Sequence, residues 1–550
     1  MSQLREKARA LVEQWLASES IAEADGILWA FTCIVTIRTA MDAVLERGHR
    51  LSAELDAYTT VVMYLHAYLS WVCLFASMLL VVRVVLGETL GRSARLALLM
   101  SPVTLLVPVV DFIVTAGRGD MVLYSYSWKT LAYDLLNLFL PWKHIEMVGT
   151  GPRVEIAIVT ASAVVATGWL MGRDERPWRR WLRGVALGAS IYAVVFVFGY
   201  LPAIYASMGR VLPRSSLDAS AAQGAFSMYL VPVIALGAGL AAAGWREDRR
   251  LTRAVLGAFY PSRVVLYLYM LGFGFVLTAV DGGKLASLRD AGTLWRLGCA
   301  AVSICLLFAA AKLDNDLHDQ AIDRVSNPDR PLVSGAMTEA QARSWRRAFV
   351  LLSLLFGVSV DRGFLWLWLV LWTASSVYSA PPWRARRVYP LGHVVIATIA
   401  ITTFFAGGMV VESYKFYVAL RDHYVVLLAF GACFTLAQVK DGKDLAGDAA
   451  AGVPSLFSIV GRVAGAAPGE LALVHKATAG VLALVLMALL AAILRRLGVL
   501  HMAAVGGLAA FALAAGAVVF RLRTPRQIDR LLVCVAALLV YESAVWLRTL

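Results

Sequence analysis

The stretch that decides the fold is LGCAAVSICLLFAAAKLDNDLHDQAID, residues 297–323. Its first part is almost entirely apolar and predicts a membrane-spanning helix. Its last nine residues, 315–323, hold three aspartates and one asparagine. An uncompensated carboxylate in hydrocarbon costs about 2.5–3.5 kcal/mol. We therefore expect these side chains at the end of the span, where they line a wet cavity and share cations.

The rest of the chain is similarly apolar. Of its 550 residues, 60% are hydrophobic and 16% are charged, and the mean hydropathy is +0.70. Apolar runs of about 20 residues recur along nearly the whole length, and each can cross a bilayer as a helix. The sequence predicts an all-α, polytopic membrane protein. The first 26 residues carry charges throughout and lack the apolar core of a secretory signal, so the first membrane segment is also expected to direct insertion.

Charge and cysteine usage argue against two other classes of site. The net charge of +14 could suggest nucleic acid. In a membrane protein, however, excess Arg and Lys mark cytoplasmic loops and contact with anionic membrane lipid, so nucleic acid is not an expected partner. The six cysteines are scattered singly through apolar stretches, without a CxxC pair. This pattern indicates small buried side chains rather than a metal site.

A charged stretch, WREDRRLTR at residues 245–253, divides the chain into two membrane halves. We expect an N-terminal helical domain at 1–245 and a second domain at 246–550. Residues 24–50 form either a span or an interfacial helix, because charged residues interrupt them. Six further spans are predicted in the first domain, at 59–86, 96–116, 121–142, 154–172, 184–207 and 222–244. Nine spans are predicted in the second domain, at 262–281, 297–316, 345–360, 363–380, 390–411, 424–440, 474–494, 500–520 and 530–548.

The distribution of basic residues supports nine spans in the second domain. The loops expected on one side of the membrane hold 21 Lys or Arg, and those on the other side hold 7. Loops rich in Lys and Arg stay in the cytoplasm. The bias therefore predicts a multi-pass protein of the cell membrane, with both acidic clusters described below on the cytoplasmic side.

The first acidic cluster has helical spacing. Asn315, Asp319 and Asp323 are four residues apart, which predicts a single row along a helix. Asp316 lies about 100° round the helix from Asn315 and faces the same cavity less directly.

A second acidic cluster, KDGKDLAGD at residues 440–448, begins where another span ends. Asp441, Asp444 and Asp448 again share one helical face. Several like charges on one stripe repel each other unless they share cations. Mg²⁺ suits such rows, because it prefers hard oxygen ligands and often binds through one or two carboxylates plus substrate phosphates. The two rows therefore predict a magnesium site.

Taken alone, the first cluster does not establish a functional site. An acidic patch at a helix end is often a solvated loop. An EF-hand interpretation of DNDLHDQAIDRV, residues 314–325, fails because Asp319 occupies the sixth position instead of Gly and Val325 the twelfth instead of Glu. His318 lies on another face of the helix and is a weaker candidate for ligand contact.

Three further motifs favour a functional site. RVSNPDRPLVSG lies at 324–335, VYSAPPWRARR at 377–387 and GDAAAGVPSLFSIVG at 447–461. With them, residues 255–550 resemble the UbiA-type intramembrane prenyltransferase superfamily. Its signature is an NDxxDxxxD motif, an RPL-x-SG turn, a YSxPP stretch with basic residues and a KDxxDxxGDxxxG motif. All four appear here in that order, and the nine-helix count agrees.

The resemblance implies Mg²⁺-dependent transfer of a prenyl group from a prenyl diphosphate donor to a lipophilic acceptor. Charge grows on the departing pyrophosphate, so Mg²⁺ held between the acidic clusters would stabilise the transition state. The family's role of holding the metal–diphosphate carries over to Asn315, Asp319, Asp323, Asp444 and Asp448, with Asp316 and Asp441 as supporting metal ligands.

The basic residues of the motifs are expected to contact the diphosphate. Arg330 would bind it through a planar fork and Lys440 as a point charge. Arg384 and Arg386 are weaker candidates, because basic residues in a cytoplasmic loop are ordinary topology signals. Phe457 departs from the family pattern, which commonly has proline there, and we expect it to alter the local helix more than the metal site.

The order NPDRPL resembles the subgroup that contains chlorophyll synthases and archaeal geranylgeranylglyceryl-phosphate transferases. Two other functions stay open. An intramembrane terpene cyclase shares the acidic motifs but forms product from prenyl diphosphate alone. A transporter or lipid-handling protein would use the acidic rows as an ion path. It would need no diphosphate-binding arginine, so the RPL turn and the YSAPP stretch argue against it.

The N-terminal half, residues 1–245, matches no motif. Charged residues inside spans indicate function, and here they include Asp111, Lys129 and Asp134. YSYSWKTLAYDLL, residues 124–136, also suits a segment lying on the membrane surface. Lys129 and Asp134 are five residues apart, which is poor spacing for a pair on one helix face. We interpret this half as an accessory domain that handles a lipid substrate or acceptor, or docks a partner.

Overall fold

The computed structural model describes residues 22–41, 57–117, 128–137, 150–170, 176–201, 228–259, 261–411 and 423–548, with isolated residues between these ranges. Contacts divide the chain into two units, Met1–Thr252 and Arg253–Leu550. The described secondary structure is entirely helical, which confirms the predicted fold class. Ten helices within these ranges are long and apolar enough to cross a membrane.

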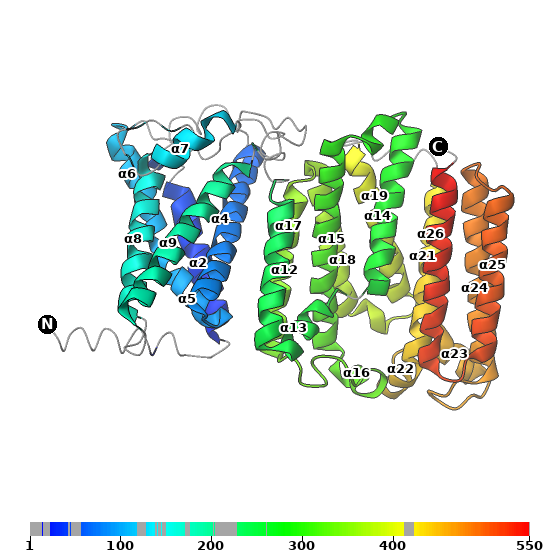
Figure 1. The fold of residues 1–550 in the computed structure, drawn as a ribbon. Helices are drawn as coiled ribbons and strands as arrows, with labels where there is room; N and C mark the ends of the chain where they lie inside the picture. The colour runs from blue at the N-terminus through cyan, green and yellow to red at the C-terminus, as the bar shows by residue number, and fades with distance from the viewer. Residues whose placement is uncertain are drawn as a thin grey trace. The chain divides into compact units, whose positions relative to one another are not determined.

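The C-terminal unit contains nine long helices among its described residues, and they stand side by side in Figure 1. Each overlaps one predicted span. They are α14 (Pro261–Asp281), α15 (Ala291–His318), α17 (Glu339–Val358), α18 (Arg362–Ser379), α19 (Leu391–Val411), α21 (His423–Asp441), α24 (Leu473–Arg496), α25 (Met502–Arg521) and α26 (Asp529–Leu547). Six of them, α14, α15, α19, α21, α24 and α25, are among the helices that are long and apolar enough to cross a membrane.

Polar side chains fix where several of these helices begin. Asp290 precedes α15 and accepts a hydrogen bond from the Thr293 backbone N–H at 2.7 Å. Thr338 and Gln341 form a reciprocal capping box at the start of α17. Asp361 accepts from the Gly363 N–H before α18. Each cap satisfies an N–H that has no partner within the helix, so the polar residues between the apolar runs set the helix boundaries.

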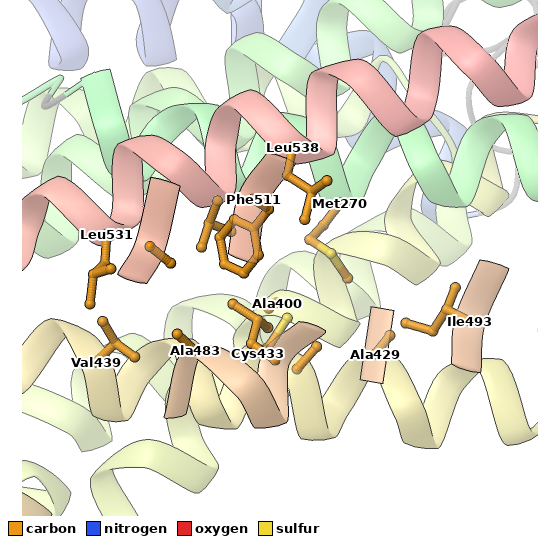
Figure 2. Close-up of a cluster of buried hydrophobic side chains, with 14 of the residues drawn as sticks. Met270, Ala400, Ala429, Cys433, Val439, Ala483, Ile493, Phe511, Leu531 and Leu538 are labelled. Carbon is orange, nitrogen blue, oxygen red and sulfur yellow. The ribbon is translucent and has the colours of Figure 1, made fainter. Parts of the chain in front are cut away.

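The core of the unit lies between α14, α19, α21, α24, α25 and α26. Figure 2 shows its side chains, among them Met270, Cys433, Phe511 and Leu538, pointing toward one another. Glycines allow the closest helix contact. A Cβ atom at Gly274 of α14 would collide with the backbone of Phe404 in α19. Small residues at such contacts let backbones approach, which is how membrane helices gain packing energy.

Replacing Gly274 therefore tests the packing of α14 on α19. We expect Gly274→Ala to destabilise the protein by about 1–3 kcal/mol, because the new methyl group overlaps backbone that cannot rotate away. Gly272→Ala is the matched control, since a Cβ at Gly272 meets nothing within 4 Å. Alanine favours helix over glycine, so the control should be neutral or slightly stabilised in thermal unfolding of the detergent-solubilised protein. Equal melting temperatures for the two variants would contradict the packing.

The two acidic clusters do not lie on continuous helices. α15 ends at His318, Asp319 forms the joint with φ −107° and ψ 13°, and the short helix α16 (Gln320–Ser326) follows. After α21, the chain passes through the 3-10 turn η6 (Gly442–Asp444) into α22 (Leu445–Ala451). The predicted single helical rows are therefore wrong in both clusters. Periodicity in the sequence indicates which residues would share a face of one helix, but it does not show where that helix ends.

The N-terminal unit is also helical in its described parts. The prediction for 96–116 corresponds to a bent segment in which the 3-10 turn η2 (Ser101–Leu105) joins α5 to α6. Of the uncertain first segment, residues 24–50, the part up to residue 41 lies in α2. The remaining long helices cover most of four predicted spans. The helices are α2 (Ala22–Met41), α4 (Ala57–Leu86), α5 (Leu90–Met100), α6 (Leu106–Val114), α8 (Thr150–Leu170), α9 (Pro177–Gly199) and α12 (Leu230–Glu247).

The predicted span at 121–142 is wrong where the structure describes it. The 3-10 turn η3 (Trp128–Thr130) leads into α7 (Leu131–Asn137), whose seven residues rise only about 10 Å. Asp134 is buried and accepts a hydrogen bond of 2.7 Å from the Tyr200 hydroxyl. Arg153 donates to backbone carbonyls beyond the end of α7, including that of Leu140. The rest of the predicted span lies outside the described residues.

Candidate functional site

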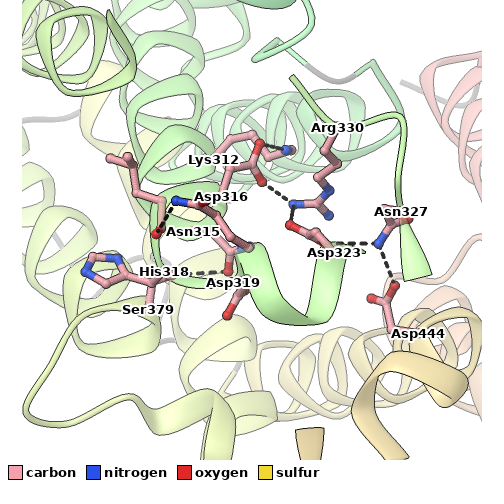
Figure 3. Close-up of polar contacts among 12 residues, drawn as sticks. Lys312, Asn315, Asp316, His318, Asp319, Asp323, Asn327, Arg330, Ser379 and Asp444 are labelled. Carbon is pink, nitrogen blue, oxygen red and sulfur yellow. Dashed lines mark hydrogen bonds and ion pairs between the residues drawn. The ribbon is translucent and has the colours of Figure 1, made fainter. Parts of the chain in front are cut away.

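Arg330 organises the first acidic cluster (Figure 3). It belongs to the turn after α16, where its carbonyl accepts from the Ser334 N–H at 2.8 Å. Its guanidinium binds Asp316, and Nη1 lies 3.1 Å from Asp323 Oδ2. Lys312 binds Asp316 from the preceding turn of α15. Arg330, which the sequence predicts as a diphosphate contact, has carboxylates as its partners in this structure.

Asn327 joins the first cluster to the second. Its side-chain amide donates to Asp323 Oδ1 at 3.2 Å and to Asp444 Oδ1 at 3.3 Å. Figure 3 shows the amide between the two carboxylates. α16 packs against α22, which brings these segments together although they are more than 100 residues apart in sequence. Asn327 was not among the predicted site residues.

Arg386 forms a second connection between the clusters. It lies in the 3-10 turn η5 (Ala385–Arg387), where it binds Asp319 and reaches Asp448 Oδ1 at 3.4 Å. The sequence predicts Arg384 and Arg386 alike as weaker candidates for diphosphate contact. In the structure the two side chains have different surroundings. Arg384 has a left-handed backbone (φ 38°, ψ 55°), and its guanidinium Nε has no hydrogen-bond partner among the described residues.

His393 supports the second cluster from the start of α19. Its ring is buried, and Nε2 lies 2.9 Å from Asp441 Oδ2. Lys440 approaches the same carboxylate at 4.0 Å and stands 5.9 Å from the centre of the Tyr378 ring. His393 was also missed, because a single histidine at the beginning of an apolar run carries no recognisable spacing. The Nδ1 atom of His318 contacts the Asp314 carbonyl at 2.8 Å.

Phe457 lies directly behind the second cluster. It is completely buried in the first turn of α23 (Leu456–Val463), which Ser455 caps. A Cβ at Gly442, inside the acidic motif, would come within 2.8 Å of the Phe457 ring. The ring therefore packs against the backbone that carries Asp441 and Asp444.

The charged groups of the site are shielded from water, and their pKa values are shifted by this burial and by the neighbouring charges. Burial raises the pKa of Asp323 to about 6, against the opposing effect of Arg330. Burial alone would lower the pKa of Arg330, but the neighbouring aspartates hold that pKa above its ordinary value. Tyr378 and Asp319 likewise outweigh burial and raise the pKa of Arg386. Both arginines therefore stay charged between the carboxylates.

A cavity of about 160 Å³ opens beside the clusters. One end is polar and is lined by Lys312, Asn315, Tyr378, Ser379 and Lys440. Asn315 Oδ1 accepts from the Ser379 hydroxyl there at 3.3 Å. The rest of the wall is mostly apolar and comes from α14, α15, α18, α19, α21 and α26. The arrangement can hold an anionic head group at one end and a hydrocarbon chain along its length.

The donor chemistry of the clusters suits Mg²⁺, because carboxylate oxygens are the ligands this ion prefers. Asp323 Oδ2 is buried and has no hydrogen-bond partner among the described residues, although Arg330 Nη1 lies 3.1 Å away. No three His, Cys, Asp or Glu side chains of the described ranges converge on a common point that could hold an ion. The positive charge between the carboxylates comes instead from Arg330 and Arg386. The carboxylate oxygens therefore fit Mg²⁺ as ligand types. To bind one ion together, they would have to rearrange their ion pairs with Arg330 and Arg386.

Comparison with known proteins identifies the part of the chain that carries this site. Residues 275–539 match the model of the UbiA prenyltransferase family. The C-terminal segment is of the UbiA type. The match lies inside the region 255–550 that resembles this family in sequence, and it contains every predicted site residue. The UbiA-type segment begins after the charged stretch that divides the sequence.

Curated relatives match over part of their length. The digeranylgeranylglyceryl phosphate synthase of Methanoculleus marisnigri is 29% identical over 163 residues, which are 29% of this chain and 56% of that protein. The enzyme of that name from Natronomonas pharaonis is 31% identical over 195 residues, 34% of this chain and 64% of that protein. The chain thus spans between half and two thirds of the length of these relatives.

Solved UbiA homologues also align with this chain. The apo homologue from Aeropyrum pernix K1 has a TM-score of 0.40 and 20% identity, and the alignment covers 52% of this chain and 97% of that one. The homologue from Archaeoglobus fulgidus bound to GPP and Mg²⁺ has a TM-score of 0.36 and 18% identity, with 53% and 99% covered.

The role of Arg386 as a link between the clusters can be tested through stability. Arg386→Ala leaves Asp319 and Asp448 without their shared cation, and breaking such a buried pair costs about 3–5 kcal/mol. We expect a clear fall in the free energy of unfolding. Arg387→Ala is the control on the same turn, since Arg387 is exposed and its loss should change stability by no more than about 0.5 kcal/mol. Equal effects of both substitutions in denaturant or thermal unfolding would contradict the bridging role.

Proposed function

We propose that the protein is an integral membrane, Mg²⁺-dependent prenyltransferase that ionises a prenyl diphosphate and transfers the prenyl group to a lipophilic acceptor. The observation that carries the proposal is the meeting of both acidic clusters at the polar end of an apolar cavity. The family match and the names of the curated relatives support it. We further propose that this end faces the cytoplasm of a cell membrane, because the Lys and Arg bias assigns its loops to that side.

The acidic side chains would hold the metal in this proposal. Bound Mg²⁺ would neutralise charge on the diphosphate, and its ligands would come from Asp316, Asp319, Asp323, Asp441, Asp444 and Asp448. Asn315 supplies a neutral oxygen at the cavity wall, next to Ser379. Asn327 and His393 would act on the reaction through these carboxylates, by fixing Asp323, Asp444 and Asp441 in position.

The basic side chains would bind the diphosphate oxygens. Arg330 and Arg386 present planar forks suited to phosphate, and Lys440 adds a point charge at the cavity wall. The bond between the prenyl C1 carbon and the diphosphate oxygen breaks, and both electrons leave with pyrophosphate. Cations fixed beside those oxygens stabilise the growing charge without having to reorganise.

The cavity wall would protect the resulting allylic cation. Its lining is mostly apolar, so little water is available to trap the cation. Tyr267, Phe308 and Tyr378 are among the lining residues, and aromatic rings attract cations. The acceptor's nucleophilic atom forms the new bond to C1 and then loses its proton. We propose an accessory role for residues 1–245, which lie outside the family match, in handling a lipid substrate or acceptor or docking a partner.

Substitution of Asp319 tests whether the clusters carry the reaction. We expect Asp319→Asn to lower pyrophosphate release from a panel of prenyl diphosphates by at least about 10²-fold, because a charged contact to the leaving group's metal is lost. The full-length protein in detergent is assayed with Mg²⁺ and a membrane lipid extract as the source of acceptor. Glu470→Gln, an exposed carboxylate on a loop, is the control and should retain full activity. Unchanged release in Asp319→Asn would contradict the proposal.

Removal of the metal and of the acceptor gives a second test. EDTA should abolish pyrophosphate release and added Mg²⁺ should restore it, since carboxylates alone repel the diphosphate. Release should also depend on the lipid extract. Hydrocarbon products formed from the diphosphate alone would identify a terpene cyclase instead. Pyrophosphate release that is insensitive to EDTA would contradict the Mg²⁺-dependent mechanism, and absence of release under every condition would exclude both enzymes.

A further inference from the structure

The cavity beside the acidic clusters continues into a second, deeper one. This deep cavity has a volume of about 70 Å³ and lies between α14, α21, α24 and α26. The two cavities share six lining residues, so they are adjoining parts of one groove. The shared residues are Leu266, Tyr269, Cys433, Leu436, Val535 and Leu539. Met270, Ala429 and Ile493, which Figure 2 shows in the core, belong to the wall of the deep part.

The deep part lies far from the acidic clusters. Asp529, at the start of α26, accepts a hydrogen bond of 3.0 Å from Lys443 in the second cluster. Glu542 lies thirteen residues further along α26 and lines the deep cavity. The helical rise of 1.5 Å per residue places it about 20 Å from Asp529. The groove thus runs from the charged end toward the opposite side of the membrane.

Glu542 is a buried carboxyl that the proposed reaction does not use. Its side chain is 6% exposed, and neither of its oxygens has a hydrogen-bond partner among the described residues. A Cβ atom at Gly507 of α25 would collide with its Oε1, so the carboxyl is closely held between α25 and the cavity. Buried polar groups are normally hydrogen-bonded, and each exception calls for an explanation.

Two more polar side chains line or adjoin the same spot. Tyr269 lines both parts of the groove, and Ser543, the neighbour of Glu542, lines the deep part with it. Ser543 in turn donates to the Leu539 carbonyl at 2.8 Å. Tyr269 and Glu542 both line the deep cavity. The remaining residues of the deep cavity are hydrophobic.

We propose that Glu542, Tyr269 and Ser543 form a polar subsite, which binds the hydroxyl group of a lipophilic molecule lodged in the deep part of the groove. A hydroxyl both donates and accepts hydrogen bonds, so it can satisfy a carboxyl that has no partner in the protein. The apolar wall takes the hydrocarbon body of the ligand. The ligand is either a substrate that shares the groove or a bilayer lipid bound beside it. The substrate alternative rests on the proposed function, whereas the subsite itself does not.

A comparison of two matched probes tests the subsite without requiring activity. The full-length protein in detergent is unfolded by heat with hexadecanol or with hexadecane, which differs by the hydroxyl alone. Hexadecanol should raise the melting temperature of the wild type in a concentration-dependent way, since ligands that bind the native state stabilise it. Hexadecane should have a smaller effect. An equal rise with hexadecane would overturn the proposal.

Two substitutions test whether Glu542 causes the difference in melting temperature between the two probes. Glu542→Leu should abolish the difference between the probes, and Glu542→Gln, which keeps hydrogen-bonding capacity, should retain part of it. Without a ligand, Glu542→Leu should melt at or above the wild-type temperature, because it removes a buried group that has no partner. Glu470→Leu controls for the loss of an exposed carboxylate. A full hexadecanol effect in Glu542→Leu would overturn the proposal.

The source of the ligand is decided by pyrophosphate release from geranylgeranyl diphosphate. Competition by hexadecanol, seen as a several-fold rise in KM in the wild type but not in Glu542→Leu, assigns the subsite to the substrate groove. An unchanged KM together with the thermal shift assigns it to a bilayer lipid, and either result supports hydroxyl binding. Complete absence of pyrophosphate release in all variants would refute the proposed function and leave the thermal comparison to decide on the subsite.

Discussion

The ion pairs between two arginines and two acidic clusters hold the functional end of the C-terminal unit together. Arg330 pairs with Asp316 and Asp323 within the first cluster. Arg386 pairs with Asp319 of the first cluster and with Asp448 of the second. Buried carboxylates without such partners would be costly, because their charge has left water. The ion pairs therefore hold the loops that supply the arginines and the acidic clusters in place against each other.

This constraint determines how the helices end. α15 and α21 each stop within their acidic motif, and the chain continues in a short helix that turns the later aspartates toward the other cluster. Glycine contacts between α14 and α19 bring two walls of the groove together. The charged end and the apolar groove then lie in one unit, as the proposed binding of metal, diphosphate and a prenyl chain requires. Neither part alone would suit an amphiphilic substrate.

The sequence predicts the helices of the C-terminal unit well, because long apolar runs have few alternatives in a membrane. It predicts the region 121–142 poorly. Apolar content there does not distinguish a crossing helix from a short one, and the buried pair of Asp134 and Tyr200 has no local signature. Apolar composition thus indicates the long helices of the C-terminal unit well, but it does not show whether a segment such as 121–142 crosses the membrane.

The sequence indicates the motif residues of the candidate site, whose roles remain a proposal, and it does not indicate the residues that support them. Spacing identifies the aspartates, yet the helical rows it suggests are interrupted at Asp319 and at Gly442–Asp444. Arg386 is a weak candidate in the sequence because loop arginines are common topology signals, and position in space alone distinguishes it from Arg384. Asn327 and His393 act across segments that are distant in sequence. Contacts of this kind produce no periodic pattern in the amino-acid sequence.

The most direct test of the account is whether the two clusters form one metal site. Mn²⁺, which takes the same oxygen ligands as Mg²⁺, can be titrated by electron paramagnetic resonance with an unreactive thiolo analogue of a prenyl diphosphate. The account predicts tight Mn²⁺ binding to the wild type with the analogue, and similar weakening by Asp319→Asn and Asp448→Asn. Binding in Asp448→Asn as tight as in the wild type would show that the second cluster does not share the metal, and would contradict the account.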